Sequence, residues 1–136
     1  MLIEALADST DQRGRGFSVI AGQLARVGDV RDVHITTINP GCMRGNHYHP
    51  SRRELIAVLY RDAWSLHWDT GAGTAVTHRS IQGVGGVLVG PPAGWSHAVR
   101  NDGGVELVLV ALSDVAYDHA HPDVVRRDVI SQRSAA

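Results

Sequence analysis

The chain is organised around the stretch GCMRGNHYHPSRRE at residues 41–54. His47 and His49 lie two positions apart in it, so on an extended strand both imidazoles project from the same face, with Cα atoms roughly 7 Å apart. Glu54 follows a Pro-Ser turn and opens an apolar run, which predicts a strand that returns antiparallel beside the first. His97 follows a later turn of proline and glycine. The spacing therefore allows three imidazoles and one carboxylate to meet at a single point.

This stretch and a second one, GVLVGPPAGWSHAVRN at residues 86–101, resemble the two motifs of the cupin superfamily. The first motif is Gly, five residues, His-x-His, four residues, Glu, six residues, Gly, and the chain matches it until Arg61 replaces the last glycine. The second motif is Gly, five residues, Pro-x-Gly, two residues, His, three residues, Asn, and it matches throughout. The resemblance implies an all-β, single-domain fold, a small antiparallel β-barrel of the jelly-roll type. It also implies a divalent metal ion bound by His47, His49, Glu54 and His97.

Imidazole and carboxylate ligands suit Fe, Mn, Ni, Co or Zn, and the ligand types do not choose among these metals. Protein ligands that leave open coordination positions permit catalysis without demanding it. The alternative is that the histidines form a hydrogen-bonded polar cluster without metal.

A narrower resemblance lies inside the first stretch. RGNHYH at residues 44–49 is similar to the RGxHxH signature of cupins that act on nucleotide-linked keto sugars, the sugar 3,4-ketoisomerases and the 3,5-epimerase group. DQRG at residues 11–14 is similar to a DxRG segment near the start of those enzymes. The resemblance implies that His47 and His49 are a catalytic pair that moves a proton alpha to the sugar carbonyl. It also implies that Arg44 lines the active site near the anionic substrate.

These two resemblances conflict, because a histidine that binds metal is not free to act as a base. If metal binds, it would polarise the carbonyl, and Tyr48, His34 or His67 would carry the proton. We expect a cupin enzyme that isomerises or epimerises a keto-sugar-like small molecule, nucleotide-linked or free, with a divalent-metal site. The alternatives are a metal-dependent cupin of another class, such as a dioxygenase, decarboxylase or lyase, and a non-catalytic small-molecule-binding cupin.

Three residues join Arg44 as candidates for substrate binding. His34 and His67 each lie on an alternating strand pattern and can line the pocket, although a polar surface or satisfied core position is the plainer interpretation. Trp95 lies inside the second motif, where it can wall the pocket and stack on a base or sugar. Tyr48 alternates with the two motif histidines, so we expect it on the opposite strand face, packed in the core.

Short apolar runs with turn signals between them favour a barrel over an α/β fold. We expect an N-terminal arm over residues 1–16, helical or irregular in its first ten residues, a barrel over about 17–112 and a polar tail over 113–136. Helical turns are expected within residues 123–130 of the tail. The strands expected besides the motif strand span residues 17–27, 30–38, 54–60, 63–68, 74–81 and 105–112. A barrel this small has exposed sheet edges, so we expect a homodimer in which strand exchange through residues 1–27 covers them.

Composition excludes several classes of function. A net charge of −1 gives no electrostatic footprint for nucleic acid or an anionic membrane. Apolar runs are shorter than the roughly 18 residues of a membrane helix, so we expect a cytoplasmic protein with a small-molecule substrate. Cys42 is the single cysteine, which rules out an intrachain disulfide. All 13 basic residues are arginine, which excludes Schiff-base lysine chemistry and the P-loop lysine.

Overall fold

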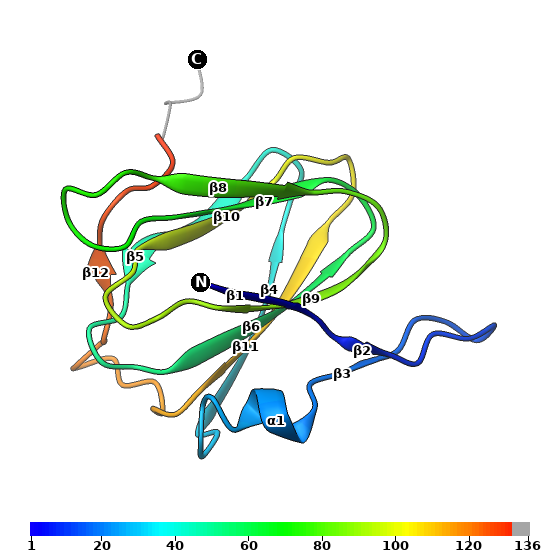
Figure 1. Cartoon of the computed structure of the whole chain (residues 1–136), viewed down its shortest axis with the longest axis horizontal. Coiled ribbons are helices and arrows are strands. Elements are labelled where there is room, and N and C mark those ends of the chain that lie inside the picture. The colour runs from blue at the N-terminus through cyan, green and yellow to red at the C-terminus, as the bar shows by residue number, and fades with distance from the viewer. Residues whose placement is uncertain (132–136) are drawn as a thin grey trace.

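The computed structural model of the chain, shown in Figure 1, describes residues 1–131. Its main body is a barrel of two five-stranded antiparallel sheets that face each other (Figure 1). One short helix, α1 (Ala21–Leu24), lies outside the barrel. The all-β antiparallel barrel predicted from the sequence is therefore confirmed. No helix within residues 1–131 combines the length and the apolar character needed to cross a membrane.

The two sheets are built from strands far apart in the sequence. The first sheet has the order β1 (Leu2–Ala5), β9 (Gly85–Gly90), β6 (Glu54–Tyr60), β11 (Leu107–Ser113) and β4 (Asp32–Ile38). The second has the order β12 (Val125–Arg126), β5 (Met43–Tyr48), β10 (His97–Asn101), β7 (Trp64–Trp68) and β8 (Thr77–Ile81). A separate hairpin pairs β2 (Ala7–Asp8) with β3 (Phe17–Ser18) and projects from the barrel (Figure 1).

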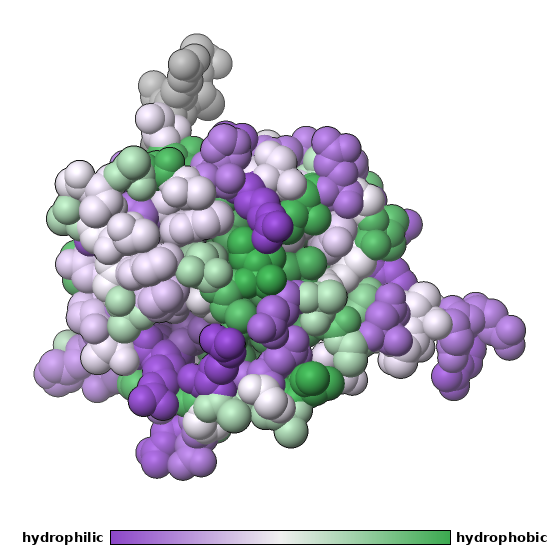
Figure 2. Space-filling view, in the orientation of Figure 1, coloured by the Kyte–Doolittle hydropathy of each residue, from purple (hydrophilic) through white to green (hydrophobic). Residues whose placement is uncertain are grey.

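Strand β6 is apolar on both faces because both faces are covered. Ile56, Val58 and Tyr60 point between the sheets, where they join the main core cluster. Leu55 and Ala57 point outward and join a second cluster with residues of the N-terminal segment around β2, β3 and α1. Full burial of a Leu, Ile or Val side chain, such as those of Leu55, Ile56 and Val58, stabilises the fold by about 1.5–3 kcal/mol. Figure 2 shows further apolar surface near β1, whose Ile3 is partly buried against the main core cluster.

The N-terminal region differs from its prediction. Residues 1–10, expected to be helical or irregular, contain β1 and β2, and β1 extends the first sheet by pairing with β9. The strand expected over residues 17–27 ends at Ser18 and gives way to α1. The helical turn lets Val27, only 1% exposed, pack on the outer face of the first sheet. Burial of that outer face thus outweighs the strand propensity of the segment.

The tail also differs from its prediction. The helical turns expected within residues 123–130 are absent from that part of the structure, and Val125–Arg126 forms β12, which pairs with β5. The free edge of β5 offers unpaired backbone groups that the tail satisfies as a strand. The last five positions of the predicted tail, residues 132–136, lie outside the described residues. The prediction for residues 54–60 matches β6, and the strands expected over residues 30–38, 63–68, 74–81 and 105–112 agree within three residues at their ends.

Candidate metal centre

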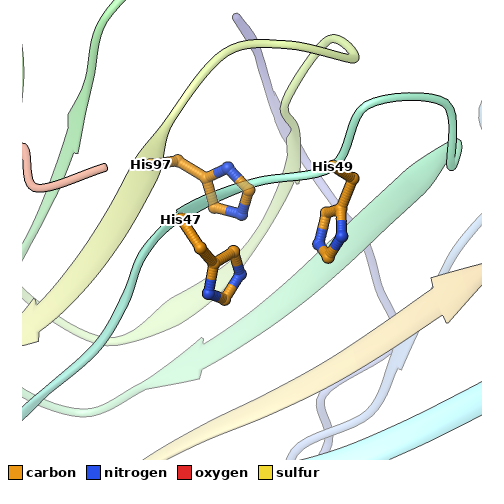
Figure 3. Close-up of side chains that lie close together, drawn as sticks. All are labelled: His47, His49 and His97. Carbon is orange, nitrogen blue, oxygen red and sulfur yellow. The ribbon is translucent and has the colours of Figure 1, made fainter. Parts of the chain in front are cut away.

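Strands from both sheets bring the predicted ligands together. His47 on β5 lies directly opposite His97 on the neighbouring strand β10. His49 follows the end of β5, and Glu54 begins β6 on the facing sheet. Figure 3 shows the three imidazoles close together in the space between the sheets. The geometric prediction that the imidazole of His97 meets those of His47 and His49 is confirmed.

The distances suit a common metal ion. One ring nitrogen from each histidine lies within 4.8 Å of those of the other two. The Glu54 carboxylate lies 3.3 Å from Nε2 of His49 and 3.6 Å from Nε2 of His97. These side chains of Glu54, His49 and His97 are 10% exposed or less.

Backbone carbonyls determine which ring nitrogens face the centre. Nδ1 of His49 donates to the carbonyl oxygen of Asp123 at 2.5 Å, and Nδ1 of His97 donates to that of Trp95 at 3.1 Å. Because a carbonyl only accepts, both neutral imidazoles carry their proton on Nδ1. Both Nε2 atoms are buried and have no hydrogen-bond partner in the described structure, since their approach to Glu54 lacks hydrogen-bond geometry. In the neutral form each Nε2 atom therefore presents a bare lone pair to the centre.

The Nε2 atoms of His49 and His97, which lack hydrogen-bond partners, test whether the residues fit a metal. A histidine that binds metal characteristically donates its other ring N–H to a carbonyl or carboxylate, as His49 and His97 do. Imidazole nitrogens with one carboxylate form a donor set suited to first-row divalent ions. The residues present fit such an ion.

Burial and mutual repulsion govern the protonation of the cluster. Burial, followed by the charges of His97 and His49, lowers the pKa of His47 to about 4. Burial also opposes charge on His49, but the neighbouring Glu54 carboxylate outweighs this and raises the pKa of His49. Burial alone would raise the pKa of Glu54, yet contacts with His49 and His97 lower it. His47 is therefore neutral and Glu54 ionised at neutral pH, which are the protonation states of metal ligands.

A bulge in β5 positions His47. The register between β5 and β10 shifts so that Gly45, not Asn46, lies opposite Ala98. Gly45 and Asn46 both have positive φ, 112° and 59°. A Cβ on Gly45 would lie 2.5 Å from the carbonyl oxygen of His97, so the close approach of the two ligand strands requires glycine there.

Two adjoining cavities meet at the centre. The smaller, about 340 Å³, lies between the sheets and is lined by His34, Thr36, Met43, Arg44, Gly45, His47, Glu54, Ile56, His97, Val99, Leu109 and Ala111. The larger, about 550 Å³, is lined by Asp32, His34, His47, His49, Arg52, Glu54, Ala111, Ser113, Tyr117 and Val124. The residues that both share, His34, His47, Glu54 and Ala111, place the centre at their junction.

The structure brings some of the other predicted site residues to the centre and leaves others away from it. His34 and Arg44 line the cavities, and Nε of Arg44 donates to the carbonyl of Thr37 at 2.8 Å. His67 lies on the strand face opposite the buried Leu66, stacked on His78, so it is not brought to the centre.

The remaining two predictions concern Tyr48 and Trp95. The Tyr48 ring packs under the guanidinium of Arg127 at 4.3 Å, away from the cavities. The Trp95 side chain is not among those that line the two cavities, although its backbone carbonyl orients His97.

Two residues near the centre carried no recognisable signal in the sequence. Arg52 lines the larger cavity from a motif position with no specified residue type. Asp123 orients His49 through its carbonyl, a contact across 74 positions. The residue type of Asp123 gives no hint of such a backbone contact.

Comparison with known proteins gives a family match over most of the chain. The model of a family described as the polysaccharide biosynthesis C-terminal domain matches residues 9–125. A curated relative, UDP-2-acetamido-2,6-beta-L-arabino-hexul-4-ose reductase of Pseudomonas aeruginosa, is 26% identical over 101 residues, which cover 74% of this chain and 27% of the relative. The chain thus spans about a quarter of the length of that relative.

Solved structures share the fold at low identity. Capsular polysaccharide assembling protein CapF from Staphylococcus aureus is 22% identical, with a TM-score of 0.66, over 91% of this chain and 33% of that one. A 3,4-ketoisomerase from Helicobacter canadensis is 15% identical, with a TM-score of 0.66, over 92% of this chain and 89% of that one. These similarities confirm the cupin fold that the two sequence motifs predicted.

Proposed function

The chain belongs to the polysaccharide biosynthesis C-terminal domain family, and from this premise we propose that it is a sugar-modifying enzyme of the cupin type. Its substrate would be a nucleotide-linked keto sugar, and its reaction the movement of a proton on the carbon beside the carbonyl. The curated relative is named for a UDP-linked hexulose. A mutant of a 3,4-ketoisomerase from Thermoanaerobacterium thermosaccharolyticum, with a similar fold, is described in complex with TDP-4-keto-6-deoxyglucose.

The observation that carries the proposal is the pair of bare Nε2 atoms on His49 and His97 beside the ionised Glu54, at the junction of two cavities. In the proposal His47, His49, His97 and Glu54 hold a divalent metal. When bound, such an ion supplies Lewis-acid stabilisation of negative charge on a carbonyl oxygen. The lowered pKa of His47 suits a neutral ligand better than a general base.

The proton carrier in this proposal is His34. It projects from β4 into both cavities and lies outside the ligand set. Imidazole is the side chain most often used for general acid–base catalysis, and a positioned one contributes about 10²–10⁴-fold to rate. Arg44 would contact the substrate from the wall of the smaller cavity, where its guanidinium donates one hydrogen bond to Thr37.

Solvent exchange tests the reaction. Metal-loaded protein is incubated in D2O with TDP-4-keto-6-deoxyglucose or with its UDP-linked acetamido counterpart, and the sugar is analysed by mass spectrometry. We expect deuterium on the carbon beside the carbonyl, and a loss of about 100-fold in exchange rate for His34→Gln. His78→Gln, on the outer face of β8, is the matched control and should exchange at the wild-type rate. Absence of exchange into both sugars would contradict the proposed reaction.

Elemental analysis tests the metal. We expect about one equivalent of divalent metal in the wild-type protein and its loss in Glu54→Ala, because the variant removes the anionic ligand. Absence of metal from both proteins would favour the metal-free mechanism in which His47 and His49 exchange the proton.

The homodimer remains part of the proposal, with a changed contact. Strand β1 already covers one edge of the first sheet within the chain. The opposite edge is β4, whose Val33 and Ile35 are 56% and 68% exposed. An apolar edge strand of this kind favours pairing with a second copy. Cytoplasmic localisation stays a prediction.

A further inference from the structure

Arg52 is a buried cation that has no ion-pair partner among residues 1–131. It lies in the turn between His49 and Glu54 and is 8% exposed. Its Nε atom is buried and has no hydrogen-bond partner, and the guanidinium forms no ion pair with any residue from 1 to 131. Charged side chains are rarely buried unless paired, because the loss of hydration costs several kcal/mol.

The nearby carboxylates are engaged elsewhere. Asp123 accepts hydrogen bonds through Oδ2 from the backbone N–H of Ser51 at 3.2 Å and of Arg52 at 2.8 Å. Glu54 faces the histidines. These contacts fix the backbone of the turn, and the charge of the Asp123 carboxylate acts on the guanidinium of Arg52 without an ion pair between the two side chains.

The side chain of Arg52 forms part of the wall of the larger cavity. That cavity, about 550 Å³, also reaches His47 and His49, and its volume lies within the range of small-molecule sites. A ligand group held at Arg52 would therefore be adjacent to the metal centre, while the rest of the molecule could occupy the cavity junction.

We propose that Arg52 binds the diphosphate group of the nucleotide-linked substrate in the larger cavity. This inference rests on the proposed function, since it assigns the anionic part of the same substrate. A guanidinium presents paired N–H donors that match two oxygens of a phosphate, and charge-assisted hydrogen bonds of this kind are the strong ones. The diphosphate would supply the ion-pair partner that Arg52 lacks among the described residues.

The assignment gives different roles to the two arginines near the centre. Arg44 is exposed, belongs to the smaller cavity and already donates to Thr37. Arg52 is buried and free of such contacts within the described residues. A cation that is already buried before the ligand arrives is expected where an anion must be bound tightly. Arg52 therefore carries the phosphate contact and Arg44 does not.

The test is calorimetric titration of the metal-loaded protein with UDP, TDP and pyrophosphate. Arg52→Met should weaken binding of all three by about tenfold or more, the loss expected for a hydrogen bond to a charged group. Arg53→Met removes the adjacent exposed arginine and should bind within about twofold of wild type. Uridine and thymidine, which lack phosphate, should bind equally to wild type and Arg52→Met.

A stability measurement separates ligand binding from a structural role. Removal of a buried charge that has no ion-pair partner among the described residues should leave the Tm of Arg52→Met equal to or above that of wild type. An unfolded or strongly destabilised Arg52→Met, together with a destabilised Arg52→Lys, would show that the charge is neutralised within the fold and would overturn the inference. So would unchanged diphosphate affinity in Arg52→Met, or loss of affinity in Arg44→Met alone.

The outcomes also distinguish this inference from the proposed function. Solvent exchange by wild type, combined with diphosphate binding that does not depend on Arg52, would overturn the inference and leave the function standing. Arg52-dependent diphosphate binding without any exchange would uphold the anion site and contradict the reaction.

Discussion

At the scale of single residues, the centre depends on backbone geometry that only certain residues permit. Gly45 lets β5 approach β10 so closely that a side chain there would overlap the carbonyl of His97. Asn46 adopts a left-handed backbone, which asparagine tolerates better than most residues. Its buried amide accepts from the backbone of Val129 and Ile130 at 3.0 and 3.1 Å. The two residues before His47 therefore hold the ligand strands at close range.

Substitution of Gly45 tests this constraint. Gly45→Ala combines a positive φ, which costs about 1–2 kcal/mol, with a backbone clash, which costs about 1–3 kcal/mol more. Gly41→Ala is the matched control, because Gly41 also has positive φ, 79°, but has open space where its Cβ would lie. Denaturant unfolding should show the larger loss for Gly45→Ala and only the smaller, conformational loss for Gly41→Ala. Equal losses would contradict the close-approach argument.

Residue patterns predicted the ligand set well and its surroundings poorly. The spacing of His47, His49 and Glu54 encodes their convergence locally, because strand periodicity and a short turn fix it. Arg52 and Asp123 gave no signal, since their positions depend on how a distant tail packs against the turn. The sequence left open whether His67 lines the pocket, because alternation shows that two faces exist but not which one is inside.

At the scale of elements, the segment around β12 holds the second sheet and the centre together. Arg127 donates to both Oδ atoms of Asp69, at 2.8 and 2.6 Å, and to the carbonyl of Gly94 at 2.7 Å. The same segment supplies the carbonyl of Asp123 that orients His49. The C-terminal segment therefore acts as a positioning element for a candidate ligand.

The Asp69–Arg127 pair predicts a pH-dependent stability. Burial alone would raise the pKa of Asp69, but hydrogen bonds from Arg127, Ser96 and Gly71 outweigh it and lower the pKa. A lowered folded pKa stabilises the fold above the ordinary pKa near 3.9, and this stability is lost as the pH falls through the folded value. Asp69→Asn should therefore cost about 1.5–3 kcal/mol at pH 7 and progressively less below about pH 4.

Denaturant unfolding at several pH values checks the predicted pH dependence of the stability lost in Asp69→Asn. Asp128→Asn is the control, because its pair with Arg126 in the same segment is exposed, at 69% and 44%, and should have no measurable effect. A pH-independent loss in Asp69→Asn would contradict the ionic origin of the stabilisation.

At the scale of the whole molecule, the two main sheets end in the edge strands β1, β4, β12 and β8, of which β4 is the longest. The two exposed apolar side chains of β4, Val33 and Ile35, alternate with His34 and so point away from the cavities that His34 lines. A second copy docked on β4 would leave the centre accessible within each barrel.

Ile35→Glu tests the proposed dimer. A charge at the most exposed apolar position of β4 should disfavour edge pairing and give a monomer in analytical ultracentrifugation. Val84→Glu is the control, since Val84 is 66% exposed but lies in the turn before β9. A dimer unaffected by Ile35→Glu would contradict the contact.

The whole barrel was more predictable than its periphery. Strands such as Glu54–Tyr60 can be recognised in the sequence, because burial on both faces requires a continuous apolar run. Residues 1–27 gave a wrong prediction because their structure follows from what the outer face of the first sheet must bury, which the local sequence does not encode.

The candidate ligands divide between the two sheets: His47 and His97 lie on strands of the second sheet and His49 directly after one, whereas Glu54 begins a strand of the first. An ion held by all four would cross-link the layers of the barrel at one end. Its binding energy would then count as folding energy, available only after both halves of the sandwich have come together.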